Sequence, residues 1–133
     1  MTVFLDVNLF IYAAGGEHPF KAPSVRLIDQ VANGSVEAVA DAEVVQELVY
    51  RYWRRGALDQ GLRLCDQVLR VVPTMLPIEK ADLVLMRKLL ETHRIIEPRD
   101  AMHAAVMLNH GITHLYSYDR HFDAIPGLTR LEP

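Results

Sequence analysis

Short apolar runs alternate along this chain with longer segments of helical periodicity. Residues 3–5 are apolar throughout and are followed at once by Asp6, and residues 36–40 are followed in the same way by Asp41. A parallel strand that is covered on both faces carries no polar alternation, so these runs predict buried strands. Open α/β sheets bind ligands outside the carboxyl ends of their strands, so Asp6 stands where a site would begin.

Further short strands are predicted at residues 112–117 and 128–131, and residues 74–76 are predicted to form either a brief strand or a connection. Between the strands, apolar spacing and breaking residues predict a short helical turn and five helices, at about residues 9–13, 23–34, 42–55, 57–72, 79–93 and 98–111. This order favours a three-layer α/β fold, in which helices flank a mainly parallel sheet of four to five strands. No linker or internal repeat interrupts the chain, so we predict a single domain over residues 1–133.

Two of these helices have clear apolar stripes. The helix after Ala42 places Glu47 on its flank, with Arg51 four residues on as an expected ion-pair partner. Its predicted buried stripe consists of Val45, Leu48, Val49, Tyr52 and Trp53. The stripe predicted for the following helix consists of Leu58, Leu62, Cys65, Leu69 and Val72.

Composition narrows the possible functions. The 17 acidic and 14 basic residues leave a net charge of −3, so nucleic-acid binding would need a local basic patch. A single cysteine, Cys65, excludes an internal disulfide and a thiolate zinc cluster. No apolar tract is long enough to span a membrane, and no basic segment precedes the first apolar run, so we expect a cytoplasmic protein with no membrane partner.

Each acidic candidate also has a purely structural interpretation. Asp6 and Asn8 can cap the helical turn that follows them, and Asp100 lies early in the helix opened by Pro98, where the helix dipole favours a carboxylate. Asp119 and Asp123 lie in a charged turn after a strand, and turns of this kind are usually solvated. Similarly, His103 is more often a packed, hydrogen-bonded residue than a metal ligand.

Considered together, the acidic residues indicate a metal site. Carboxylates packed within a few ångströms repel one another unless a cation neutralises them, and oxygen ligands without thiolates suit Mg²⁺ or Mn²⁺. A site formed by Asp6, Glu47, Asp100 and Asp119 could therefore activate water for attack on a phosphodiester. Basic residues that could contact the phosphates are Arg51, Arg54, Arg55, Arg99 and Arg120, although ion pairing and solvation account for many surface arginines.

Four ordered segments carry a family resemblance. They are residues 4–12 (FLDVNLFIY), 44–48 (VVQEL), 99–105 (RDAMHAA) and 117–122 (SYDRHF), the last followed by IPGL at 125–128. Together they resemble the PIN-domain family, in particular the VapC-like ribonuclease toxins of toxin–antitoxin pairs. The resemblance covers the whole chain.

This resemblance implies a Mg²⁺- or Mn²⁺-dependent endoribonuclease, commonly a homodimer and silenced by a small antitoxin. By residue, it implies Asp6, Glu47, Asp100 and Asp119 as catalytic metal ligands. It adds Asp123 as a possible accessory metal ligand, with Asn8 and Ser117 as auxiliary residues. Two positions depart from the usual pattern: Tyr118 replaces a smaller or basic residue, and Asp41 stands where a serine or threonine is frequent, so Asp41 is expected to cap the helix of Glu47.

Two other functions fit parts of the sequence. A haloacid-dehalogenase-type phosphatase shares a strand that ends in an aspartate, but it needs a second aspartate two residues later, where this chain has Asn8. That chemistry also gives Glu47 and Asp100 no role. A catalytically silent PIN-like module that binds RNA or protein is the other alternative, although all four acids are present.

Overall fold

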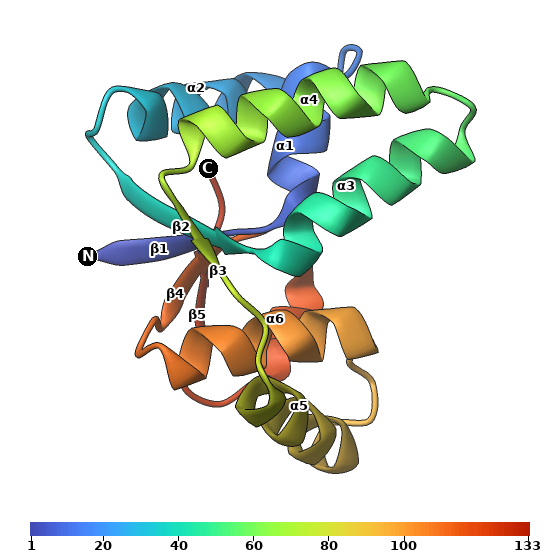
Figure 1. Ribbon diagram of the computed structural model, residues 1–133. Coiled ribbons are helices and arrows are strands. Elements are labelled where there is room, and N and C mark those ends of the chain that lie inside the picture. Colours follow the sequence, from blue (N-terminus) through green and yellow to red (C-terminus); the bar gives the residue numbers. More distant parts are fainter.

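The computed structural model describes residues 1–133 and is built on one five-stranded parallel sheet (Figure 1). The sheet order is β3-β2-β1-β4-β5, and each neighbouring pair is parallel. The strands are β1 (Thr2–Leu5), β2 (Glu37–Asp41), β3 (Thr74–Leu76), β4 (His114–Tyr116) and β5 (Thr129–Leu131). Strand β1 is central, with Val3 opposite Ala38 on one side and His114 on the other. The predicted mainly parallel sheet is confirmed.

Helices cover both faces of the sheet, which confirms the predicted three layers (Figure 1). One layer consists of α1 (Val7–Ala14), α2 (Lys21–Ala32), α3 (Ala42–Arg54) and α4 (Leu58–Val71). The other layer consists of α5 (Lys80–Thr92) and α6 (Pro98–Asn109), and a 3₁₀ turn, η1 (Arg120–Ala124), follows β4. None of these helices combines the length and the hydropathy that a membrane crossing requires.

The core lies between these layers and follows from the apolar runs. Phe4, Leu5 and Leu115 on the central strands are fully buried, as a parallel sheet covered on both faces requires. On α6 the small residues Ala101, Ala104 and Ala105 are also fully buried. These short side chains allow the helix to pack closely on the sheet, and α6 thereby brings its first turn to the sheet edge.

The buried faces of α3 and α4 differ from the predicted stripes. On α4 the buried residues are Gly61, Leu64 and Val68, whereas Leu58, Leu62 and Leu69 are exposed. The predicted stripe was wrong at Leu58, Leu62 and Leu69, although Val72 is buried as predicted, because Gly61, which carries no hydrophobic signal, lies at the α3–α4 contact. A Cβ atom at Gly61 would lie 2.6 Å from Cβ of Tyr52, so only glycine allows this approach. Cys65 is half-buried and packs against the core.

On α3 the buried face is shifted toward Glu47. Its members are Val44, Glu47, Leu48 and Tyr52, while Trp53, predicted inside, is 57% exposed. The prediction placed the stripe on the neighbouring side of the helix because residues 45, 49 and 53 are apolar. The carboxylate of Glu47 consequently points into the molecule rather than along its surface.

Candidate active site

Five acidic residues line one cavity of about 250 Å³ beside the carboxyl ends of the central strands, and four of them were predicted from the sequence. These four are Asp6, Glu47, Asp100 and Asp119. The predicted auxiliary residue Asn8 lines the same cavity, as do Arg51, Arg99 and Glu97. The structure therefore brings the four acids together, because the strands and helices that carry them all end or begin at this edge.

Asp6 reaches the cavity directly from the central strand. It is the N-cap of α1, and its Oδ1 accepts a hydrogen bond from the backbone N–H of Val7 at 2.9 Å. Its second oxygen, Oδ2, accepts a hydrogen bond from the hydroxyl of Ser117 at 2.7 Å. Capping and a place in the site are thus not alternatives here, since the two oxygens of one carboxylate serve both.

Ser117 connects two of the acids. It is fully buried after β4, and its Oγ also accepts a hydrogen bond from the backbone N–H of Asp119 at 3.0 Å. Asp119 in turn caps η1 by accepting from the backbone N–H of His121 at 2.9 Å. The turn after β4 is therefore fixed at the edge of the cavity and holds the carboxylate of Asp119 there.

Glu47 pairs with a residue that the helical spacing did not indicate. Arg99 donates from Nη1 to Oε1 of Glu47, and its Nε lies 3.4 Å from Oε1 of Glu43. The predicted pair between Glu47 and Arg51 does not form, because Arg51 instead donates to Oδ1 of Asn8 at 2.6 Å. The i, i+4 rule was misleading here because Glu47 faces inward and Arg99 approaches it from α6.

The predicted accessory ligand Asp123 lies away from this group. It does not line the cavity, and its carboxylate accepts hydrogen bonds from Nε and Nη2 of Arg130. Its side chain is 54% exposed. The turn that contains it is helical, so Asp123 projects to a different side from Asp119, and we leave it out of the candidate site.

The negative charge of an ionised Asp100 is poorly compensated by neighbouring groups. It lies in the first turn of α6, it is buried, and its Oδ2 has no hydrogen-bond partner. Burial raises the pKa of Asp100 to about 8, and the charges of Asp6 and Asp119 add to the effect. A carboxyl group in this position ionises near neutral pH only when a positive charge is supplied.

Burial also raises the pKa of Asp6 and of Glu47 above their ordinary values. For Asp6 this effect is opposed by the charge of His103 and by the hydrogen bonds from Ser117 and Val7. For Glu47 it is opposed by Arg99, which donates to it and carries a positive charge. The cavity is therefore a place where negative charge is concentrated and only partly balanced.

The donor atoms fit a divalent cation. One oxygen each from Asp6 and Glu47 and one ring nitrogen of His103 lie within 4.8 Å of one another. A second group of the same kind consists of Asp100, Asp119 and His121. Most of the donors are oxygens, which suit Mg²⁺ and Mn²⁺, and the unpartnered oxygen of Asp100 is free to bind a cation.

Two features of the candidate site were not identified from the sequence: the position of Glu97 and the contact between Asp41 and His103. Glu97 precedes α6 and lines the cavity although it is exposed. Asp41 caps α3 as expected, accepting from the N–H of Val44 at 3.0 Å, but its other oxygen lies 2.7 Å from Nδ1 of His103. The position of Asp41 at a strand end could have indicated that it lies near the site, because β2 is the neighbour of β1, which ends just before Asp6.

A parallel α/β fold with acids converging at the carboxyl edge of its sheet agrees with the sequence comparison. The model of the PIN domain family matches residues 3–128, so the chain belongs to the PIN domain family. Its relatives include ribonuclease VapC13 of Mycobacterium tuberculosis, which is 39% identical over 132 residues that cover 97% of this chain and 98% of the relative.

Solved structures agree on the fold. VapC20 of Mycobacterium tuberculosis, described as a sarcin–ricin loop cleaving toxin, superposes with a TM-score of 0.78 at 19% identity, covering 98% of this chain and 99% of that one. VapBC2 from Rickettsia felis, solved bound to a DNA fragment from its promoter, gives a TM-score of 0.78 at 20% identity. That match covers 99% of this chain and 98% of the other.

Proposed function

We propose that this chain is a divalent-metal-dependent endoribonuclease, acting as the toxin of a toxin–antitoxin pair. The observation that carries the proposal is the convergence of Asp6, Glu47, Asp100 and Asp119 on one cavity in a PIN-family chain. Ribonuclease VapC13, at 39% identity over nearly the full length of both chains, supports the choice of RNA as substrate. Solved structures with this fold that are described as toxin–antitoxin complexes or systems support an antitoxin as partner, and we extend the proposal to a small antitoxin and a homodimer.

In this proposal Asp6, Glu47, Asp100 and Asp119 hold Mg²⁺ or Mn²⁺. Such an ion, when bound, polarises a phosphate and assists the ionisation of water. Ser117 holds the carboxylate of Asp6 in one orientation by its hydrogen bond. Arg99 does the same for Glu47 and leaves part of its own guanidinium exposed toward the cavity.

Four arginines line this acidic cavity or the one next to it. Arg51 lines the acidic cavity and also a neighbouring one of about 240 Å³, which is further lined by Ile11, Tyr50, Arg54 and Arg55. Guanidinium groups in a row of this kind suit successive phosphates of one RNA strand. We propose that the strand enters across Arg54, Arg55 and Arg51, and that its scissile phosphate reaches the acids beside Arg99.

Cleavage of RNA by the purified protein tests this function. We expect cleavage with Mg²⁺ or Mn²⁺ and none with EDTA, and a loss of about 100-fold or more in the variants Asp6→Asn, Glu47→Gln and Asp100→Asn. The matched control is Asp123→Asn, which changes an acid outside the cavity and is expected to stay active. If wild type and Glu47→Gln cleave RNA equally, the site is wrongly assigned.

Expression in a host cell tests the toxin role separately. Wild type is expected to arrest growth, and Asp6→Asn is expected not to. A variant that arrests growth as strongly as wild type would indicate a binding module rather than a nuclease. The same experiment with a neighbouring small antitoxin gene should restore growth.

A further inference from the structure

His103 is fully buried one turn after Asp100 on α6, and it is held on one side by Asp41. Its Nδ1 lies 2.7 Å from Oδ2 of Asp41. The other oxygen of Asp41 accepts from the backbone N–H of Val44 at 3.0 Å, so the carboxylate is fixed at the start of α3. The ring of Phe4 packs against His103, with ring centroids 5.4 Å apart. The imidazole therefore has one defined orientation.

This arrangement fixes which nitrogen of His103 is available. Asp41 accepts a hydrogen bond at its Oδ2, so Nδ1 is the donor and carries the proton. Burial lowers the pKa of His103, but its hydrogen bond to Asp41 and the charges of Asp41, Asp6 and Asp100 raise this pKa overall, which favours the charged ring. When the ring is neutral, Nε2 has a free lone pair. Histidines that bind metals usually donate their other ring N–H to a carboxylate or a carbonyl, which is the arrangement formed here with Asp41.

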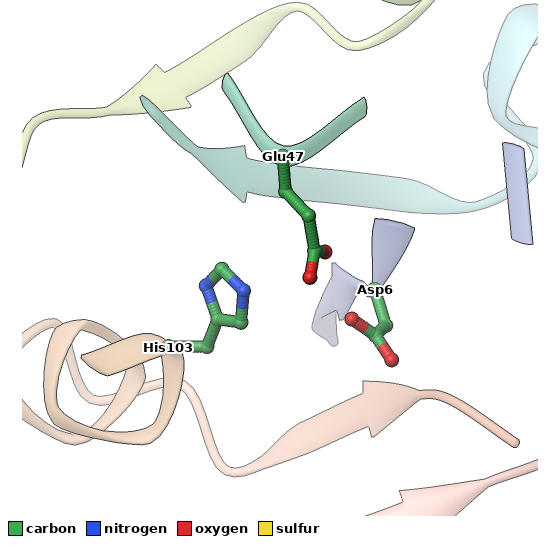
Figure 2. A group of neighbouring side chains, drawn as sticks. All are labelled: Asp6, Glu47 and His103. Atoms are coloured by element: carbon green, nitrogen blue, oxygen red, sulfur yellow. The ribbon is translucent and has the colours of Figure 1, made fainter. Parts of the chain in front are cut away.

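The free nitrogen faces the acids. Nε2 is buried and has no hydrogen-bond partner, although buried polar groups are nearly always satisfied. A ring nitrogen of His103 lies within 4.8 Å of carboxylate oxygens of Asp6 and Glu47, and Figure 2 shows one of the two ring nitrogens on the side of those carboxylates and the other pointing away.

The three donors are close enough to share one ion. Two neighbouring ligands of one cation with bonds of about 2.1 Å lie roughly 3 to 4 Å apart, a separation that falls within the 4.8 Å limit of this group. No hydrogen bond joins His103 to Asp6 or to Glu47, although all three are buried together. The bond to Asp41 accounts for Nδ1 of His103 but leaves Nε2 without a partner.

We propose that His103, held by Asp41, is a nitrogen ligand of the cation that Asp6 and Glu47 bind. This inference rests on the proposed function and deepens it by assigning a mixed nitrogen and oxygen ligand set. Imidazole adds affinity for Mn²⁺ and later transition metals more than for Mg²⁺. The site is therefore selective for Mn²⁺ over Mg²⁺, and His103 is the residue that determines this selectivity.

The test measures Mn²⁺ binding and its ligands directly, without an activity assay. Purified full-length protein is titrated with Mn²⁺, and the loss of the free-ion signal in electron paramagnetic resonance gives the dissociation constant. Electron spin-echo envelope modulation of the bound ion then detects a coordinated imidazole nitrogen, and labelling of histidine with ¹⁵N identifies its source. The experiment is run at about pH 8 because a proton competes with the metal for Nε2.

Wild type is expected to show imidazole coupling that shifts on ¹⁵N labelling. The coupling should be lost in His103→Gln and retained in His121→Ala, a control whose exposed ring belongs to the other donor group. The Mn²⁺ affinity should fall about 10-fold in Asp41→Asn, which removes the support of the ligand. The preference for Mn²⁺ over Mg²⁺ should fall in His103→Gln as well.

Two results overturn the inference while leaving the proposed function in place: Mn²⁺ bound without imidazole coupling, or coupling that persists in His103→Gln. An absence of any Mn²⁺ binding would overturn both, since the acids themselves would then hold no ion. Circular dichroism checks the fold of each variant. If His103→Gln does not fold, Asp41→Asn decides, and an unchanged Mn²⁺ affinity in that variant counts against the inference.

Discussion

The hydroxyl of Ser117 donates a hydrogen bond of 2.7 Å to Oδ2 of Asp6, although 111 positions separate the two residues in the sequence. The bond lies inside the protein, at the point where β1 and β4 end side by side. It connects the first acid of the candidate site to the segment that supplies the last one, Asp119.

We predict that Ser117→Ala lowers the free energy of unfolding by about 1 to 3 kcal/mol, because it leaves a buried carboxylate with one partner fewer. Ribonuclease activity should fall about 10-fold as the orientation of Asp6 is lost. Urea unfolding and RNA cleavage measure the two effects. Ser24→Ala is the matched control: Ser24 is also fully buried, but its hydroxyl contacts no carboxylate of the candidate site, so a smaller loss is expected.

Arg51 is expected to contribute to RNA binding and not to the positions of the acidic residues. In a Glu47→Gln background, which separates binding from cleavage, Arg51→Ala is expected to weaken binding of single-stranded RNA. The slope of log affinity against log salt concentration should fall by about 0.7, the value for one phosphate contact on a single strand. Arg87→Ala, which removes an exposed arginine paired with Glu91, should leave the slope unchanged. An unchanged slope in Arg51→Ala would place the RNA elsewhere.

The stability of the metal-free protein should fall as the pH rises. The Asp100 carboxyl ionises at 3.8 in its ordinary state and at about 8 in the folded protein, so between these values the folded state binds more protons than the unfolded state. The contribution is fully present below pH 3.8 and is lost as the pH rises to about 8. The raised pKa of Asp6 acts in the same direction.

Thermal unfolding in EDTA between pH 5.5 and 8 measures this dependence. Asp100→Asn, which removes the carboxyl group, should flatten the curve. Saturating Mg²⁺ should do the same, because the ion favours the ionised form of the acids. Stability that rises with pH in EDTA would show that the acids are better compensated than their contacts indicate.

Gly61→Ala is expected to destabilise the protein although alanine is the better helix former. The gain in helix propensity is about 1 kcal/mol, whereas overpacking against Tyr52 costs about 1 to 3 kcal/mol. We expect a net loss measured by urea unfolding. Gly16→Ala is the control, because a Cβ there meets no atom within 4 Å and the backbone does not require glycine. Equal stability of the two variants would mean that α3 and α4 move apart easily.

The sequence predicted the sheet well because buried parallel strands are nearly all apolar and end abruptly at polar residues. Asp6, Asp41 and Ser117 mark such ends, and all three lie in or beside the candidate site. Spacing on a helix was less informative. Glu47 lies on the buried face of α3, but the apolar residues of the neighbouring side formed a stronger pattern, so its burial was missed.

The partners of the acids could not be read from spacing because they come from distant elements. Arg99 reaches Glu47 from another helix, and Arg51 binds Asn8 across 43 positions. The pairing of Asp41 with His103 crosses from β2 to α6 in the same way. Each of these contacts depends on the order of strands in the sheet, which places the ends of β2, β1 and β4 side by side.

Strand order also decides when this site exists during synthesis. The central strand β1 is made first, but its neighbour β4, which carries Ser117 and Asp119 to the edge, is made last but one among the strands. A ribosome-bound chain that lacks β4 has Asp6 without its serine partner and has no fourth acid. A partial chain that ends before β4 therefore lacks two residues of the candidate site, Ser117 and Asp119, even when the rest of the sheet is complete.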